Sequence, residues 1–545
     1  MNNQLSRALS KKISFFICLT AVIFLVALLL YFFYVVFFSF SPLWSKTETL
    51  TLNSPFFLIK TTLFTIIQAF CSVLIACLLG IPLGFFIAKR QFFLSQFLKS
   101  LSGIPLSLPI LLIILGYIET FGINGYYNKL LFHLTGNRDF SIQFLYSFIG
   151  IILCQGFYNF PLVMISVARS WETISPTQAQ SAQMLGASKW KVFKDITIHQ
   201  LMGGILAGAI PVFIFCFFSF LIVLVFGKIG TTTLEVLLYN QGKNMLNYKN
   251  AALIALIETI FALIFISIYG KFEKKATKTQ NLDFSAKKRK APLSKKERIV
   301  LIAILILIFL FFIIPLLSVV FSSFCQKTHN QSSFTLSLWK KTLESSQFLI
   351  ALQNSLSIAC ITATFSVCMA FTFSILIKKT KEKMQTILKV LPFIPMAISS
   401  VLLGIGFSHT HSSTSLFTLT FAQTMIMWPF AFRQIFACIE KIPENIIYSE
   451  QLLSRTKTFG IFSLYIPYGK QSIQEAWGLI FAMSLGDATL PLILGISNCN
   501  TLSLSTYKLV AAYHFGEASV IGVVIAIISL GILYLTKQKD KKNVF

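Results

Sequence analysis

The sequence predicts an all-α polytopic membrane protein with about twelve transmembrane helices, arranged as two parallel six-helix repeats. Composition is the first reason, because 55% of the 545 residues are hydrophobic, 57 are phenylalanine and only 12% are charged. The second reason is that apolar runs long enough to cross a lipid core occur six times in each half. The third is a repeat: residues 155–239 recur at 423–507 with one constant shift of 268 positions.

The twelve apolar runs give the expected helices in chain order. The first run is about 28 residues long, which exceeds the core of a signal peptide, so we expect it to be retained as a helix. The runs of the first half are 13–40, 61–88, 101–118, 144–168, 201–227 and 251–270. Those of the second half are 299–321, 348–377, 388–407, 416–432, 473–494 and 520–535.

The net charge of +27 follows the predicted topology. If the N-terminus lies inside, 35 of the 46 Lys and Arg residues fall in inner segments, as the positive-inside rule requires. We therefore expect a multi-pass protein of the bacterial inner membrane with both termini in the cytoplasm. The basic run Lys287 to Lys290 is expected to face anionic lipid, and we expect membrane lipid rather than nucleic acid as a partner.

A basic segment divides the chain into two expected modules. Residues 271–298 combine a charge run with Pro292 and lack apolar periodicity, which is typical of a linker between modules 1–270 and 299–545. Six helices in each module give both the same orientation in the membrane. Earlier in each module the shift is 290, as between Gly116 and Gly406, so the first module has an extra outer loop within 119–143. This loop is either a contact for an external partner or a surface elaboration.

Two cytoplasmic loops, 170–200 and 440–470, are longer than a turn requires. The first is expected to form a short helix, a break at Gly186 and a second helix that leads into the membrane. Glycine suits such a break because it adopts positive φ at little cost. The second loop lies at the same place in the repeat.

The spacing in these loops resembles the cytoplasmic motif of permease subunits of binding-protein-dependent ABC importers of type I. That pattern is Glu-Ala-Ala, three residues, Gly, nine residues, then Ile-x-Leu-Pro. The first loop lacks the acidic residue and the proline of the pattern, and the second lacks its glycine. The matching positions of the first loop are Gln180, Ser181, Ala182, Gly186, Ile196 and Ile198. Those of the second are Tyr448, Ser449, Glu450, Ser454, Leu464, Ile466 and Pro467.

The resemblance implies that each loop docks on an ATP-binding subunit and transmits its movement. Two ATPase copies and a periplasmic or lipoprotein substrate-binding protein are the implied partners, and Lys189 and Lys457 are expected to contribute to docking. The sequence contains no Walker A pattern, so we expect a non-catalytic subunit without cofactor, in which ATP is hydrolysed elsewhere. The alternative is that both loops lie flat on the inner leaflet, with their lysines near lipid phosphates.

The two-module length and the Thr-Leu-x4-Tyr segments at 233–239 and 501–507 resemble fused permeases for thiamine and iron(III). The resemblance implies thiamine or its phosphates as substrate, with iron(III) as the second choice. Two other classes stay open at this point. One is an ATP-independent secondary transporter of the major-facilitator type, and the other is a membrane-embedded transferase.

Asp487 stands out as an acidic residue deep in a predicted span, where an ionised carboxylate costs several kcal/mol unless it faces water or a partner. It is a candidate for the translocation pathway together with Ser484 and Ser219, its counterpart at shift 268. The alternative is that Asp487 caps a helix broken near Gly486. The pair His409 and His411 is weak evidence for a metal site, and we expect no resident metal and no catalytic residue.

Overall fold

The structure of the chain is a computed structural model, and it is almost entirely helical. One feature departs from the predicted all-α class: an antiparallel hairpin of β1 (Cys325–Thr328) and β2 (Gln331–Phe334). The residues described are 26, 27, 29–44, 55–136, 141–174, 176–228, 230–280, 290–328, 331–380, 384–385, 388–389, 391–410, 415–453, 464–496 and 500–537.

Both halves run through a similar series of helices. In the first half these are α2 (Pro55–Lys89), α5 (Ile110–Phe121), α7 (Phe148–Thr173), α10 (Ile198–Phe217), α11 (Leu221–Phe226), α12 (Leu234–Tyr239) and α13 (Tyr248–Gln280). The second half begins with α14 (Lys295–Ile308), η5 (Phe309–Ile313) and α15 (Ile314–Ser323) in one continuous rod. It continues with α17 (Ser346–Lys379), α19 (Ser400–Thr410), α20 (Leu416–Ile439), α23 (Ile466–Gly486), α24 (Thr489–Leu494), α25 (Leu502–Ala511) and α26 (Phe515–Lys537).

Eight helices among the described residues are long and apolar enough to cross a membrane, so the predicted count of twelve is not confirmed. The first predicted run lies mostly outside the described residues, and its described part is a shorter apolar helix, Leu29–Leu43. The ninth predicted run corresponds to α19, which has only 11 residues and is too short to cross a membrane. The tenth and eleventh correspond to α20 and α23, which contain polar residues such as Gln423, Gln434 and Glu475 that reduce their hydropathy.

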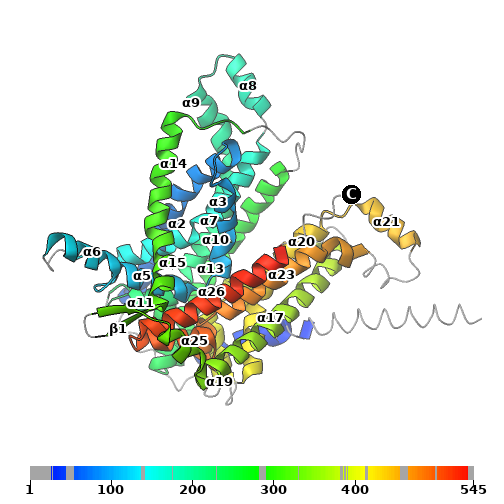
Figure 1. Cartoon of the computed structure of the whole chain (residues 1–545). Helices are drawn as coiled ribbons and strands as arrows, with labels where there is room; N and C mark the ends of the chain where they lie inside the picture. Colours follow the sequence, from blue (N-terminus) through cyan, green and yellow to red (C-terminus); the bar gives the residue numbers. More distant parts are fainter. Residues whose placement is uncertain are drawn as a thin grey trace, which may run out of the picture.

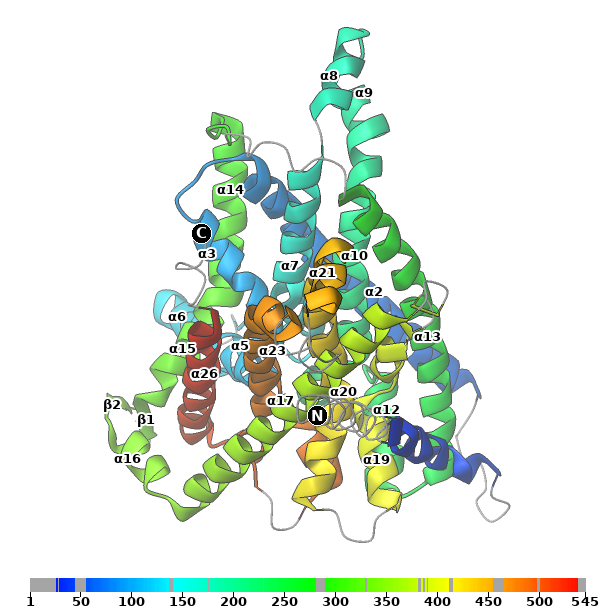
Figure 2. The same cartoon turned by 90° about the vertical axis from the view of Figure 1, so that its right-hand side faces the viewer.

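The long helices form two arms that meet at one end and diverge at the other (Figure 1). One arm contains α2, α7, α10 and α14, and the other contains α17, α20, α23 and α26. The far end of the first arm carries α8 (Pro176–Met184) and α9 (Lys189–Val192), and that of the second carries α21 (Glu444–Leu453), as the view turned by 90° also shows (Figure 2). Both predicted docking loops therefore lie at the separated ends of the arms.

Helix packing in the two arms repeats at the shift of 290 predicted for this part of the chain. A Cβ atom on Gly80 or Gly84 of α2 would lie 2.8 Å from Val163 or Val167 of α7, so these glycines let the two helices approach closely. The counterparts in α17 are Ala370 and Ser374, which are also small and are fully buried, and α17 packs against α20.

Hydrogen bonds recur in the same way. The backbone N–H of Leu234, at the start of α12, donates to Thr65 Oγ1 of α2 at 3.0 Å. The backbone N–H of Leu502, at the start of α25, donates to Ser355 Oγ of α17 at 2.8 Å. Leu234 and Leu502 differ by 268 positions, and Thr65 and Ser355 by 290. The two shifts read from the sequence thus describe one geometry, built twice.

The first helix of each half packs on the opposite half. Tyr31, near the N-terminus, stacks edge-on against Phe421 of α20, with ring centroids 5.0 Å apart, and Ser39 lies against Gly406 of α19. Reciprocally, Pro315 of α15 lies against Gly116 of α5, and Ser318 Oγ donates to the Gly116 carbonyl at 3.2 Å. A Cβ atom at Gly116 would collide with the backbone of Pro315, whereas one at Gly406 would meet the Ser39 hydroxyl.

The predicted linker is more ordered at its ends than a tether would be. Helix α13 continues to Gln280, and residues 290–294 return to the end of α2, where Ala291 pairs with Arg90 in a β-bridge. Arg90 and Glu297 form an ion pair of 2.6 Å beside the Ser294 capping box that starts α14. These contacts fix the start of the second half to the end of α2.

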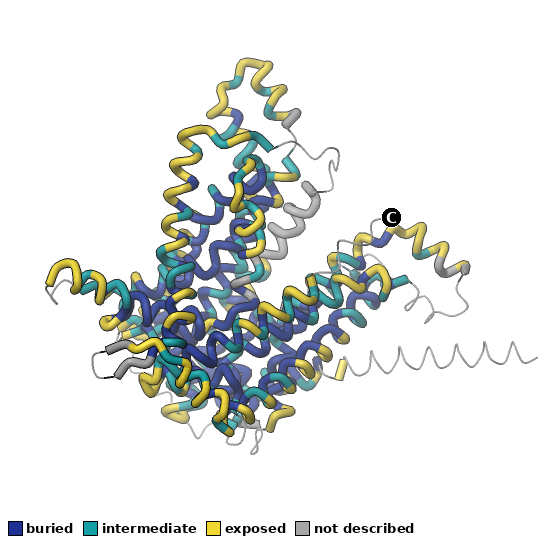
Figure 3. The backbone as a smooth tube through the Cα atoms, in the orientation of Figure 1, coloured by how far each residue is buried: buried dark blue, intermediate teal, exposed yellow. Residues whose placement is uncertain are grey.

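The extra outer loop contains a helix of its own, α6 (Tyr126–Thr135). Asn128 fixes it by donating to the carbonyls of Gly122 and Ile142 at 2.8 and 3.0 Å. Burial is concentrated inside the arms and where they meet, whereas α6, α8 and α21 are largely exposed (Figure 3).

Candidate functional site

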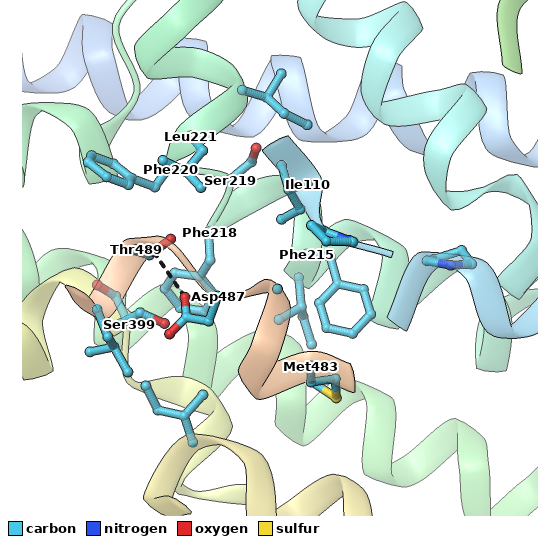
Figure 4. Close-up of a pocket in the computed structure, with 18 of the residues that line it drawn as sticks. Ile110, Phe215, Phe218, Ser219, Phe220, Leu221, Ser399, Met483, Asp487 and Thr489 are labelled. Carbon is cyan, nitrogen blue, oxygen red and sulfur yellow. Dashed lines mark hydrogen bonds between the residues drawn. The ribbon is translucent and has the colours of Figure 1, made fainter. Parts of the chain in front are cut away.

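A cavity of about 270 Å³ lies where the two halves meet. Its walls come from the start of α5 and from α7, α10, α11 and α12 of the first half, and from the segment before α19 and from α20, α23 and α24 of the second. Figure 4 shows part of this lining, including Phe215, Phe218, Ser219, Ser399 and Asp487. Ligand sites are typically apolar concavities with a few polar groups, and this cavity has that character.

Equivalent positions of the two halves line the cavity. Pro109 corresponds to Ser399 at shift 290, and Ser219 corresponds to Asp487 at shift 268. Phe215 corresponds to Met483 in the same way. The cavity therefore lies on the axis that relates the two halves, and the polar groups that the halves contribute differ.

Asp487 lines the cavity and is also tied to its own half. Its carboxylate accepts hydrogen bonds from Gln423 Nε2 at 3.1 Å and from the backbone N–H of Thr489 at 3.0 Å (Figure 4). The second bond caps the start of α24, and the first ties Asp487 to α20. Asp487 therefore lines the cavity and also bonds to the first residue of α24 and to α20, and its role in a translocation pathway stays a prediction.

The other two pathway candidates are placed differently. Ser219 lines the cavity and is 9% exposed. Ser484 is buried behind it, where its hydroxyl donates to Gln423 Oε1 at 2.6 Å and so orients the amide that holds Asp487. In the first half Gln155, the counterpart of Gln423, accepts from Ser72 Oγ at 2.8 Å and from Gln68.

Two buried acidic residues were not singled out from the sequence, one that lines the cavity and one that lies behind it. Glu235 of α12 lines the cavity, is 1% exposed and accepts a hydrogen bond from Ser399 Oγ at 3.1 Å. It follows the fifth apolar run, outside every predicted span. Glu258 of α13 is equally buried and lies within the predicted sixth span, so a search of that span for charged residues would have found it. Asp487 is therefore not the only acidic residue deep in the membrane region.

The lining has a clear chemical character. Its acidic members are Glu235 and Asp487, and none of the described residues that line the cavity is Lys, Arg or His. Aromatic faces come from Tyr158 and several phenylalanines. Tyr158 also fixes the turn before α5, because its hydroxyl donates to the carbonyls of Pro105 and Leu108 at 2.7 and 3.0 Å. The cavity thus combines two carboxyl groups with aromatic surface.

The first docking loop has the predicted form of a helix, a glycine break and a second helix. Gly186 follows α8 with φ of +85°, a conformation that costs an L residue about 1–2 kcal/mol. Ser188 then caps α9 by accepting a hydrogen bond from the Lys191 N–H, and a π-helical turn, Phe193–Thr197, joins α9 to α10. A Cβ atom at position 186 would meet no described atom within 4 Å, so the positive φ, and not crowding, is the reason for glycine at this turn.

Most side chains of this loop are exposed at the tip of the arm. The exposed set among the predicted residues is Gln180, Ser181, Gly186 and Lys189, while Ala182, Ile196 and Ile198 are partly buried. Large apolar side chains stand out in the same segment, because Met184 and Leu185 are each 89% exposed and Trp190 is 71% exposed. Exposed apolar residues of this size, gathered in one place, are typical of a surface that binds another protein.

The second loop is partly described. Tyr448 and Ser449 are exposed on α21, Glu450 belongs to the same helix, and Leu452 is 87% exposed. Leu464 and Ile466 are partly buried, and Pro467 is exposed in the first turn of α23, where proline is favoured. Ser454 and Lys457 lie outside the described residues.

These features define the class as a multi-pass membrane protein with a solute-sized cavity between two related halves. Residues 80–278 match the family described as binding-protein-dependent transport system inner membrane component. On this match and on the similarity to a permease over most of its length, the chain is a permease subunit of a binding-protein-dependent ABC importer, a non-catalytic component of the inner membrane. The family decides against the secondary-transporter and transferase alternatives.

Individual relatives differ in how much of the chain they match. The thiamine transport system permease protein ThiP of Haemophilus influenzae is 25% identical over 493 residues, which cover 87% of each chain. The molybdenum transport system permease protein ModB of the same species is 32% identical over 144 residues, 26% of this chain and 60% of that protein. The sulfate transport system permease protein CysT of Escherichia coli is 25% identical over 144 residues, 26% of this chain and 50% of that protein.

Proposed function

We propose that this permease imports thiamine or its phosphates. The observation that carries the proposal is the similarity to a thiamine permease across 87% of both chains, because the other relatives described match about a quarter of this chain. Thiamine contains a cationic thiazolium ring, and the acidic, aromatic cavity suits a cation better than an anion such as sulfate. Among the described residues, no group of three or more His, Cys, Asp or Glu side chains is arranged to hold a metal ion such as iron(III).

The test is transport by the whole system. Proteoliposomes that contain this permease, its ATP-binding subunits and its binding protein are loaded with ATP and supplied with labelled thiamine. We expect ATP-dependent accumulation of thiamine, and sulfate and ferric citrate should not compete with it. Uptake of either competitor at the expense of thiamine would overturn the substrate assignment.

Two ATP-binding subunits are the proposed partners at the tips of the arms, one at the loop 170–200 and one at 440–470. Support comes from the exposed apolar residues Leu185, Trp190 and Leu452, since such residues commonly dominate the energetics of protein interfaces. Two different loops predict two non-identical docking sites. The modules 1–270 and 299–545, joined by residues 271–298, are the proposed units that carry them.

Charge reversal tests this docking. In the double variant Lys189→Glu and Lys457→Glu we expect about tenfold weaker binding of the ATP-binding subunits, with normal insertion in the membrane. The matched control is Lys340→Glu, an exposed lysine of α16 (Ser337–Leu343), which lies beside β1 and away from α8 and α9 (Figure 2). Unchanged ATP-driven uptake in the double variant would refute the role of these lysines.

The substrate-binding protein is the proposed partner at the joined end of the arms, opposite the ATP-binding subunits. Both termini are proposed to be cytoplasmic, in accord with the distribution of Lys and Arg. Cysteines introduced at positions 3 and 543 should be labelled by a membrane-impermeant maleimide only after the cells are opened. Labelling of intact cells would reverse the orientation.

Asp487, with Ser219 beside the cavity and Ser484 behind it, is the proposed contact for the passing solute. The Asp487 carboxylate borders the cavity while Gln423 and Thr489 hold it in place. A carboxylate fixed in this way is a counter-charge that a cationic solute meets at the interface of the halves.

A further inference from the structure

Two buried glutamates of the first half have unused capacity to accept hydrogen bonds. A carboxylate offers about four acceptor positions on its two oxygens. Glu235 uses one of them, for Ser399, and within the described structure neither carboxyl oxygen of Glu258 has a hydrogen-bond partner. Both residues are 1% exposed. Buried polar atoms are nearly always paired, so these oxygens indicate a partner that binds from elsewhere.

The two carboxyl groups are neighbours. Glu258 lies on α13, which packs against α12, and it interacts electrostatically with Glu235. Two carboxyl groups this close in a region of low dielectric cannot both ionise unless a cation neutralises them. Glu235 borders the cavity, and Glu258 lies behind it. A cation in the cavity would therefore meet Glu235, with the second carboxyl group directly behind it.

Asp487 is less available for this role. Gln423 and the Thr489 N–H already occupy both of its carboxylate oxygens. In the second half the counterpart of Glu235 is Ser503 and that of Glu258 is Ala526, so the carboxyl pair occurs once. Ser503 serves a different purpose, because its hydroxyl donates to the Asp487 carbonyl at 2.6 Å.

The shape and lining restrict the ligand further. A volume of about 270 Å³ is just below the usual range for sites that hold small molecules, which begins at about 300 Å³. The surrounding aromatic rings, among them Phe215, Phe218 and Phe220, offer faces that attract a diffuse positive charge. A small organic cation fits both properties, whereas an anion would face two carboxyl groups without a basic side chain among the described lining.

We propose that Glu235, supported by Glu258, forms a binding site for the positively charged group of an organic cation in the cavity. This inference rests on the proposed import of a cationic solute and names the residues that select it. Glu235 contacts the solute, and Glu258 positions Glu235 and shares the charge. The permease itself then contributes to selection, after the binding protein has released its solute.

The site is tested with an aromatic cation and a matched anion. The complete complex of permease and ATP-binding subunits in nanodiscs is titrated with benzyltrimethylammonium or benzenesulfonate, and the thermal midpoint gives the affinity. We expect the cation to stabilise the complex and the anion to have no effect. Equal stabilisation by both ions would overturn the proposal.

Isosteric variants locate the site. Glu235→Gln should weaken cation binding by about tenfold or more, and Glu258→Gln by about threefold. Glu119→Gln is the matched control, since Glu119 is a buried carboxyl group of α5 that does not line the cavity. If the Glu235→Gln complex does not assemble, Glu235→Asp, which keeps the charge, should assemble and bind. Unchanged cation affinity in Glu235→Gln would contradict the site.

Thiamine uptake by the wild-type system separates the two proposals. Cation binding that depends on Glu235, without thiamine uptake, would overturn the substrate and keep the site. Thiamine uptake together with an unchanged affinity in Glu235→Gln would overturn the site and keep the substrate.

Discussion

The two halves of the molecule share a framework and differ in chemistry. Helix contacts and capping hydrogen bonds recur, as at Thr65 and Ser355, with the same partners at the same shifts. At the cavity, however, the chemistry differs: the position equivalent to Glu235 in the second half is Ser503, and the position equivalent to Asp487 in the first half is Ser219. Duplication thus preserved what holds the arms together, while positions that line the cavity diverged. A transported molecule that lacks two-fold symmetry needs such an asymmetric site.

The strongest test of the shared framework uses Gly116 and Gly406, the glycines where the first helix of one half packs on the other half. Gly116→Ala places a methyl group against the Pro315 carbonyl, a backbone atom that cannot move independently, whereas Gly406→Ala meets the hydroxyl of Ser39, which can rotate. We expect Gly116→Ala to cost about 3 kcal/mol and Gly406→Ala about 1 kcal/mol. Thermal unfolding of the purified permease measures both, and equal losses would show that the crossings are equivalent.

The next test concerns the divergent cavity. Asp487→Asn should reduce thiamine uptake about tenfold, because the counter-charge is lost. The asparagine oxygen can still accept the Thr489 N–H, whereas its amide nitrogen cannot accept the bond from Gln423 Nε2. Ser219→Ala, at the equivalent position of the first half, should change uptake less than about twofold. Initial uptake rates in proteoliposomes give both values. An equal effect at the two positions would contradict the asymmetry.

The docking loops give a smaller effect. Gly186→Ala forces an L residue to a φ of +85°, at a cost of about 1 kcal/mol, which corresponds to about fivefold weaker docking of the ATP-binding subunit. Gly136→Ala, a positive-φ glycine at the end of α6, is the control with the same backbone strain and no expected effect on docking. Pull-down of the ATP-binding subunits at graded concentrations measures the difference.

The smallest expected effect tests whether the two equivalent hydrogen bonds, at Thr65 and Ser355, contribute equally to stability. Thr65→Val and Ser355→Ala each remove one acceptor from a buried N–H, and we expect each to cost about 1 kcal/mol of stability. The Thr65→Val side chain keeps its volume, so its loss reports the hydrogen bond. Losses that differ by more than about 1 kcal/mol would mean that the two halves carry unequal shares of the framework.

Periodicity and spacing predicted the local structure well. The apolar runs located the long helices, the shifts of 268 and 290 described real equivalences, and Gly186 marked a real break because positive φ is a local property. The exchange of first helices was not predictable, since nothing in the run at 13–40 specifies which half it contacts. Glu235 was missed because it follows an apolar run, yet the folded chain returns it to the membrane interior at the cavity.

The exchanged first helices have a consequence for how the chain is made. A ribosome delivers Tyr31 to the membrane long before Phe407 and Phe421, the aromatic residues against which its ring packs. The first helix therefore lacks these two contacts until most of the second half has been synthesised. A truncated product that ends at the linker would lack α15, the helix that packs against Gly116 of α5. Each half thus gains its complete set of helix contacts only when the whole chain has been made.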